Sequence, residues 1–384
     1  MEVHQTISHS PYSLFIENQQ IFHSHFVGAK LAKVGTINHQ PINNFVLLLR
    51  ASVLKKIDHY ITTPHSNQIA KALLLGQNKN LEKEISEAYI TAGTMHVLAV
   101  SGLHVGIIYG FFFLFIKPYQ LPGRKRVLDL SFVIIIIWVY ALITVMSPSV
   151  MRAATMFTLM AMAQMKSRSP SIYNSLALSA LILLVFDPFI LFSVGFQLSY
   201  MAVLGIVLLQ PKIVKWWEPR NRIIQYLWEI TSVGIAAQMA TFPISVHYFH
   251  VFPTYFIISN LIAIPGAFLV MAFGIPFMLL SFLKPLAVVL GGLVDLLLRV
   301  ENWVMFSFQE LPLAQIGHIN FSPVEMVLFW TLVISVYLLA EENKKKYAYF
   351  SLMILSGLIL INWVALWKDY HRNELYIYQI DKNV

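Results

Sequence analysis

The feature that most constrains this sequence is a nearly continuous series of apolar runs, separated only by short polar clusters. A bilayer core of about 30 Å needs about 20 helical residues. Charged residues make up 12% of the chain and hydrophobic residues 57%, against about 25% and about 45–50% in soluble proteins. So few charges cannot cover so much apolar surface, which excludes a soluble enzyme. The sequence predicts an all-α polytopic membrane protein with about ten spans, and nine to eleven are all compatible with the pattern. The runs lie near residues 94–116, 128–146, 149–165, 172–186, 189–209, 223–246, 254–283, 285–308, 323–340 and 347–367.

Basic residues indicate how these runs are oriented. Every second loop carries Lys or Arg, and the loops near 147–148, 187–188, 247–253 and 309–322 carry none. Because Lys and Arg accumulate on the cytoplasmic side, we expect both termini outside the cytoplasm. The basic loop residues are Lys117, Arg124, Lys125, Arg126, Lys166, Arg168, Lys212, Lys215, Arg220, Arg222, Lys284, Lys344, Lys345 and Lys346.

The residues outside this region are more mixed. We expect a partial extracytoplasmic segment over residues 1–65, in which alternating apolar residues predict one or two strands. An apolar stripe interrupted between Gly76 and Asn80 predicts helices over residues 66–93. These helices either lie flat on the bilayer or form an ordinary helix pair. Residues 94–367 form the transmembrane domain, and residues 368–384 a short extracytoplasmic tail.

Ionisable side chains within apolar runs are candidate functional groups, because a charge is costly in hydrocarbon. Arg152 is either an anchor at the interface or a fixed positive charge facing a water-filled pathway. His96 and His104 either donate hydrogen bonds in a cavity or pack in the interior. Between them, Ser101 and Gly102 allow close backbone approach or a helix break. Their spacing is wrong for a chelating pair, so we expect no metal and no cofactor.

Other polar residues mark the later runs. Asp187 and Pro188 predict a helix N-cap followed by proline at the first helical position. Gln197 lies deep in an apolar stretch, so its amide bonds to a neighbouring helix or faces water. Asp295 and Arg299, four residues apart, predict a local ion pair.

Two consecutive runs contain proline together with polar residues. Gln238 and Pro243 interrupt the sixth run, and Asn260 and Pro265 the seventh. Either these runs are broken helices of the kind found in transporter and channel cores, or they contain ordinary proline kinks.

Motifs for hydrolysis are missing from this sequence. It has no Walker loop, no H-E-x-x-H, no G-x-S-x-G and no cysteine. We therefore expect no enzymatic activity, and any transport must be driven by a gradient or by another protein.

The segment from His96 to Val105 resembles the signature of the ComEC competence family, the inner-membrane channel for DNA uptake in transformable bacteria. Four further blocks resemble the family in the same order. They contain Pro148 to Ala153, Asp187-Pro188 with Gly195 to Ala202, Gln238 to Pro243, and Asn260 to Pro265. The resemblance covers about residues 70–283.

The resemblance implies a multi-pass protein of the bacterial cytoplasmic membrane that conducts single-stranded DNA during natural transformation. It also implies a periplasmic DNA receptor and a cytoplasmic ATPase or helicase as partners, and a pore either within one subunit or between subunits of a homo-oligomer. The residues it assigns to the DNA pathway are His96, Ser101, Gly102, His104, Arg152, Gly195, Gln197, Ser199, Gln238, Asn260 and Pro265. Those it assigns to structural roles are Pro148, Asp187, Pro188 and Pro243.

The sequence also departs from the family pattern. Larger members carry an OB-fold before this region and many carry a metallo-β-lactamase-like nuclease domain after it. We expect a truncated form, in which residues 12–28 are the remainder of the first module and residues 374–380 a single strand. Two other functions stay open: a secondary transporter of a small organic anion, and a non-conducting scaffold. The channel interpretation requires that some buried amides and imidazoles lack protein partners.

Overall fold

The computed structural model describes residues 41–78, 81–115, 117, 120–166, 168–169, 171–342 and 344–371. The strands expected within residues 12–28 and 374–380 lie outside the described residues. The α-helices are α2 Pro41–Tyr60, α3 Pro64–Leu75, α4 Lys83–Thr91, α5 Met95–Leu98, α6 Gly102–Phe115, α7 Gly123–Ile143, α8 Pro148–Met165, α9 Ile172–Phe186, α10 Val194–Ile213, α11 Arg222–Phe249, α12 Phe256–Leu280, α13 Lys284–Gln309, α14 Pro323–Glu342 and α15 Lys345–Tyr370.

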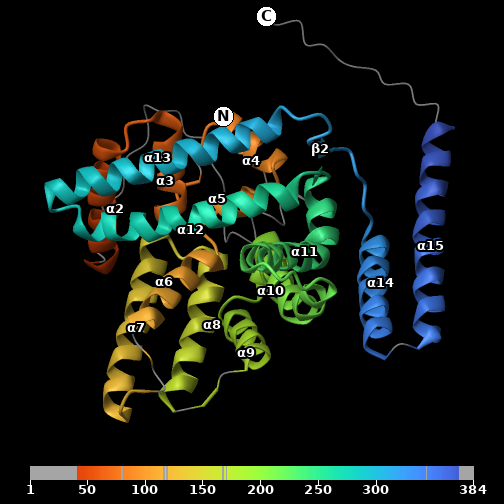
Figure 1. Ribbon diagram of the computed structural model, residues 1–384, viewed down its shortest axis with the longest axis horizontal. Helices are drawn as coiled ribbons and strands as arrows, with labels where there is room; N and C mark the ends of the chain where they lie inside the picture. The colour runs from red at the N-terminus through yellow and green to blue at the C-terminus, as the bar shows by residue number, and fades with distance from the viewer. Residues whose placement is uncertain are drawn as a thin grey trace, which may run out of the picture.

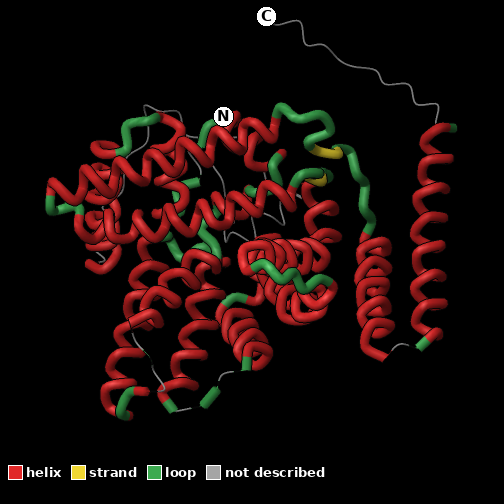
Figure 2. Tube along the Cα trace, in the orientation of Figure 1, coloured by secondary structure: helices red, strands yellow, loops and turns green. Residues whose placement is uncertain are grey.

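The helices do not all share one direction. In Figure 1, α12 and α13 run across the view above α6, α7 and α8, which run downward, and α14 and α15 stand as a hairpin at one side. Short 3₁₀ helices, η2 (Pro188–Phe192) and η3 (Val214–Trp216), flank α10. Strands β1 (Phe252–Pro253) and β2 (Gln315–Ile316) pair antiparallel and tie the end of α11 to the segment after α13 (Figure 2).

Five described helices are long and apolar enough to cross a membrane: α7, α10 with η3, α12, α14 and α15. Helices α6 and α9 are apolar but shorter. The structure therefore agrees with an all-α membrane protein, whereas the expected count of about ten spans is not confirmed. Helix α13 shows why fewer helices qualify as spans than expected: it is long enough, but Asp295, Arg299 and Glu301 interrupt its apolar sequence.

Helices α3 and α4 occupy the region where the sequence predicts helices, and Gly76 ends α3 in the left-handed conformation, with φ of 69°. Their apolar stripes are fully buried, including Leu73 and Tyr89. Both helices pack against α13. The core leaves little space, because a Cβ at Gly274 of α12 would lie 2.6 Å from Leu74. These stripes therefore face the protein interior and not a lipid surface.

The prolines do not break the sixth and seventh runs, which corrects the expectation of broken spans there. Helix α11 continues through Pro243, and α12 continues through Pro265 and Pro276. A proline leaves one backbone carbonyl without its donor, and side chains nearby can compensate. For Pro243 that carbonyl belongs to Met239, and Trp330 Nε1 donates to the adjacent Ala240 carbonyl oxygen at 3.0 Å. The first run does break, between α5 and α6, and the fifth begins as the 3₁₀ helix η2 before α10.

Polar side chains hold the α14–α15 hairpin together. Glu325 is buried at the start of α14, where its carboxylate accepts from the Ser322 backbone N–H and hydroxyl, each at 2.7 Å. Asn362 of α15 donates to the same carboxylate at 2.9 Å. Farther along, the Ser335 and Ser351 hydroxyls lie 2.8 Å apart. Hydrogen bonds between helices are effective in an apolar environment, because few other partners are available.

The predicted ion pair of α13 is confirmed. Arg299 Nε donates to Asp295 Oδ2 at 3.1 Å, and the Thr63 hydroxyl donates to the same oxygen at 3.1 Å. Asp295 is buried and Arg299 is exposed, so the pair lets a carboxylate enter the protein interior with its charge compensated.

Glu325→Ala is expected to destabilise the hairpin, because it removes both the cap of α14 and its bond to α15. The expected loss is about 1–2 kcal/mol in the free energy of unfolding, measured as a lower melting temperature in detergent. Glu342→Ala is the control, since the exposed Glu342 bonds only locally, to Lys344 and at 3.4 Å to the Tyr347 hydroxyl, around the turn after α14. Equal melting temperatures for the two variants would contradict the proposed role of Glu325.

Candidate functional site

At the break between α5 and α6, the side chains of Ser101 and His104 accept hydrogen bonds from the local backbone. The Ser101 backbone N–H donates to His104 Nδ1 at 3.1 Å, and the Leu103 N–H donates to the Ser101 hydroxyl at 3.3 Å. The hydroxyl thus caps α6, whose first backbone donors have no partner within the helix. Because Nδ1 of His104 accepts a hydrogen bond, the neutral imidazole carries its proton on Nε2.

Arg152 reaches from the first turns of α8 to the neighbouring α10. Pro148 starts α8, and Arg152 is only 6% exposed. Its guanidinium donates to the Ser199 carbonyl oxygen at 2.6 Å and lies 5.7 Å from the centre of the Tyr200 ring. The Ser149 and Ser199 hydroxyls are 3.4 Å apart. The second and third sequence blocks therefore meet at this arginine.

The first block joins them through Gly102. A Cβ at Gly102 would lie 2.5 Å from an Arg152 terminal nitrogen and 3.4 Å from the Ala153 Cβ. Only glycine allows the arginine to lie against the start of α6 in this way. We call Ser101, Gly102, His104, Arg152 and Ser199 the arginine cluster. It gathers residues from three segments that lie far apart in the sequence.

Two donors of the arginine cluster have no acceptor among the described residues. They are Nε of Arg152 and Nε2 of His104, and both atoms are buried. Arg152 also forms no ion pair with a described carboxylate. A buried donor without an acceptor costs about 1–3 kcal/mol. The cluster therefore contains two buried donors whose desolvation is not compensated by a described acceptor.

The remaining residues of the third block serve the turn before α10. The Asp187 carboxylate accepts from the Phe189 N–H at 3.0 Å and caps η2, whose first residue is Pro188. Gln197 was expected to bond to a neighbouring helix or face water, and its amide donates an exposed hydrogen bond of 3.1 Å to the Leu191 carbonyl of the adjacent 3₁₀ helix η2. Gly195 is exposed, and a Cβ there would meet nothing within 4 Å.

The fourth and fifth blocks lie on different helices. Gln238 and Pro243 belong to α11, and Asn260 and Pro265 to α12. Within the described part of the chain, none of these four residues hydrogen-bonds to the arginine cluster. Asn260 is 9% exposed, and its Oδ1 is a buried acceptor without a described donor. His96 is exposed in the short helix α5.

Sequence reasoning missed three polar residues of interest. Ser149 and Tyr200 contact the arginine cluster, and both lie within blocks that the sequence had marked. Glu301 of α13 is 4% exposed with both carboxylate oxygens unpaired, close to Gly266 of α12. In the sequence, Glu301 could have been recognised as an acidic residue inside the apolar run at 285–308. Within the described ranges, no three His, Asp or Glu side chains gather as metal ligands.

The same blocks fall within a known protein family. Residues 73–343 match the family described as Competence protein, which is more than half of the chain. The chain belongs to the competence protein family. No solved structure matches it.

Several curated proteins are similar to this competence-family chain. It is 29% identical to ComE operon protein 3 of Bacillus subtilis over 78% of the chain and 37% of that protein. It is 23% identical to the uncharacterized protein YcaI of Escherichia coli over 89% of the chain and 46% of that protein. It is 24% identical to Recombination protein 2 of Haemophilus influenzae over 61% of the chain and 31% of that protein. The chain thus spans less than half the length of these three relatives.

A designed disulfide tests the contact between the second and third blocks. The chain has no cysteine, so Ser149→Cys with Ser199→Cys adds the only two thiols. Their hydroxyls lie 3.4 Å apart, and we expect the pair to form a disulfide under mild oxidation. Mass spectrometry of proteolytic fragments detects the linked peptides. Ser149→Cys with Gly195→Cys, one turn earlier on α10, is the control and should stay reduced. Equal cross-linking of both pairs would be evidence against this contact.

Two glycines of α6 provide a second test. Gly102→Ala is expected to push Arg152 away from the Ser199 carbonyl and to lower the free energy of unfolding by about 1–2 kcal/mol. Gly110→Ala should leave stability unchanged or raise it slightly, because a Cβ there meets nothing within 4 Å. Melting temperatures in detergent measure both effects. A Gly102→Ala protein as stable as Gly110→Ala would argue against close packing of Arg152 on Gly102.

Proposed function

We propose that this chain conducts single-stranded DNA across the bacterial cytoplasmic membrane during natural transformation. The observation that carries the proposal is the arginine cluster, which combines three blocks of the competence family around a buried guanidinium. The similarity to ComE operon protein 3 supports a role in DNA uptake. Channel activity, DNA binding and the assignment of single residues to a pathway belong to the proposal.

The chemistry of the cluster suits a phosphate backbone. A polyanion crossing a medium of low dielectric needs water or fixed positive charge along its path. The guanidinium supplies such a charge, and Arg152 Nε and His104 Nε2 are buried donors without a described acceptor. An anionic oxygen bound by both would form charge-assisted hydrogen bonds. The channel interpretation requires unsatisfied polar groups of this kind.

Basic residues support an orientation for the proposed channel. In Figure 1 the start of α7, the end of α8 and the start of α15 lie at the same lower edge. These ends carry Arg124, Lys125, Lys166, Lys345 and Lys346. We propose that this edge faces the cytoplasm, with both termini outside. The arginine cluster, at the opposite end of α8, would then lie toward the outer side. The full count of about ten crossings stays a prediction.

Partners complete the proposed function. The chain contains no ATP-hydrolysis motif, so we propose that a cytoplasmic ATPase or helicase pulls the strand inward and that a periplasmic receptor delivers it. We also propose that the chain itself is not an enzyme. The pore lies either within one subunit or between copies of a homo-oligomer.

A secondary transporter of a small organic anion is the second candidate, because the same two donors could bind a carboxylate. It predicts saturable uptake of a small solute into liposomes without a partner ATPase. DNA conduction predicts instead that single-stranded DNA arrested in transit cross-links to residues 96–104, 152 or 195–202.

Substitution of Arg152 tests the proposal in a naturally competent host. Arg152→Ala should reduce transformation about 10-fold to 100-fold, the effect of losing one charged hydrogen bond, while membrane abundance stays normal. Arg152→Lys should recover only part of the activity, since lysine lacks the planar fork. Arg168→Ala, which removes an exposed arginine after α8, is the control. Transformation frequency and immunoblotting of membranes provide the measurements.

Gln197→Leu is a further test, and we expect it to reduce transformation by disturbing the turn before α10. Loss of either variant protein from the membrane would assign it a purely structural role. Unchanged entry of transforming DNA into the cytoplasm after deletion of the gene would exclude the proposed function and leave the anion transporter and the scaffold as alternatives.

A further inference from the structure

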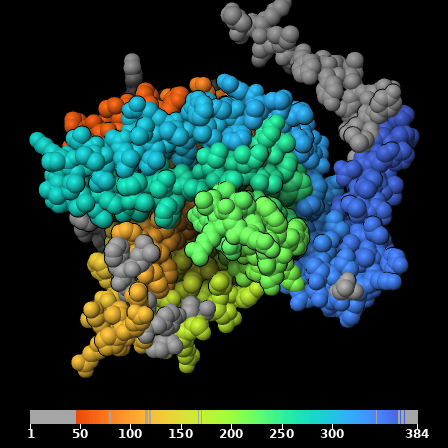
Figure 3. Space-filling model, viewed as in Figure 1, coloured from red at the N-terminus to blue at the C-terminus, as the bar shows by residue number. Residues whose placement is uncertain are grey.

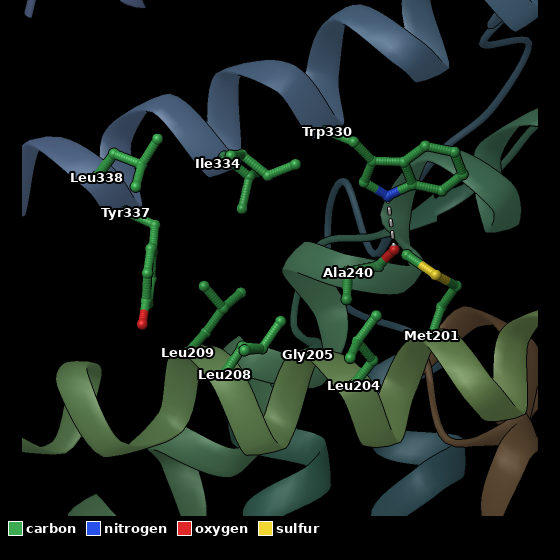
Figure 4. Close-up of a pocket in the computed structure, with 11 residues that line it drawn as sticks. Met201, Leu204, Gly205, Leu208, Leu209, Ala240, Trp330, Ile334, Tyr337 and Leu338 are labelled. Carbon is green, nitrogen blue, oxygen red and sulfur yellow. Dashed lines mark hydrogen bonds between the residues drawn. The ribbon is translucent and has the colours of Figure 1, made fainter. Parts of the chain in front are cut away.

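An apolar groove of about 480 Å³ separates the hairpin from the rest of the molecule. Its walls are α10 and α14, and Ala240 of α11 forms part of its floor (Figure 4). In Figure 3 the hairpin forms the blue edge of the molecule beside its green central part. The lining side chains are aliphatic or aromatic: Met201, Leu204, Leu208, Leu209, Trp330, Val333, Ile334, Tyr337 and Leu338.

The groove is long and narrow. Its lining runs from Met201 to Leu209 on α10 and from Trp330 to Leu338 on α14, which is about 12 Å along each helix. Figure 4 shows side chains of the two helices pointing toward one another across the gap. This shape fits an extended hydrocarbon chain.

The environment excludes water as the occupant. Helices α10 and α14 are both among the membrane-span candidates, and the groove offers water almost no polar partner. An empty groove would forfeit dispersion contacts along both walls. In a bilayer, the occupant is therefore apolar.

One end of the groove is positively charged. Lys212 lies 4.4 Å from the centre of the Tyr337 ring and pairs with Glu341. Beyond it come Lys215, which is exposed, and the turn carrying Lys344, Lys345 and Lys346. Glu342 pairs with Lys344. Two carboxylates for five lysines leave an excess of positive charge at this end.

We propose that the groove binds one anionic phospholipid, with an acyl chain between α10 and α14 and the phosphate headgroup at the lysine end. The charge selects this occupant over a partner helix, because a neutral apolar helix would gain nothing from the lysines. Basic residues beside a membrane helix attract anionic headgroups. The bound lipid would fill the space between the hairpin and α10–α11, and this role does not depend on DNA conduction.

Native mass spectrometry of the full chain in detergent tests the site. With added phosphatidylglycerol, we expect the wild-type chain to retain one lipid, at least about fivefold more than with phosphatidylcholine. Ile334→Trp fills the groove and should abolish this retention. Ile359→Trp is the matched control, because Ile334 and Ile359 are 58% and 62% exposed. Lys215→Glu should reduce the preference for the anionic lipid and leave an acyl chain bound.

A second measurement uses only the wild-type chain and so does not depend on folding of a variant. Phosphatidylglycerol with a photoreactive acyl chain should cross-link to peptides containing Leu208 or Ile334. Cross-linking spread evenly over α7, α12 and α15, equal retention by the Ile334→Trp and Ile359→Trp proteins, or a dimer seated on the groove in place of lipid would each overturn the proposal.

Discussion

The constraint on which this structure depends is that the interior of a bilayer offers no water to polar groups. Each polar side chain placed there needs a protein partner or a functional reason to lack one. In the hairpin, Glu325 is satisfied by Ser322 and Asn362. In α13, Oδ2 of Asp295 accepts from Arg299 and Thr63, whereas its Oδ1 is buried without a described donor. Arg152 and His104 each carry a buried donor without a described acceptor, and Asn260 and Glu301 carry buried acceptors without a described donor.

In the arginine cluster, one side chain connects three helices. Arg152 connects α8 to α10 through the Ser199 carbonyl and packs against Gly102 at the start of α6. A lysine could keep the charge, but not a planar group that bonds on one edge and leaves another donor available. The guanidinium thus lies where three distant family blocks meet, since each block supplies a group close to it.

Local patterns predicted much of this arrangement. The Gly76 interruption, the Asp187 cap and the Asp295–Arg299 pair follow from chemistry within a few residues. For the prolines of α11 and α12 the sequence left broken helices and ordinary kinks open, and the structure excludes the broken helices because both helices are continuous. For Gln197 the sequence left a neighbouring helix and water as partners, and the amide bonds to the adjacent 3₁₀ helix η2.

The sequence by itself determined the membrane class, because its apolar runs and scarce charges leave no soluble fold available. It also determined which polar residues are unusual, and through them the family. Only the tertiary structure decided which of these residues meet. Gly102, Arg152 and Ser199 come together while Gly195 remains exposed. The groove between α10 and α14 likewise arises only when the hairpin packs beside α11. Such contacts depend on how helices cross, which no single-segment pattern encodes.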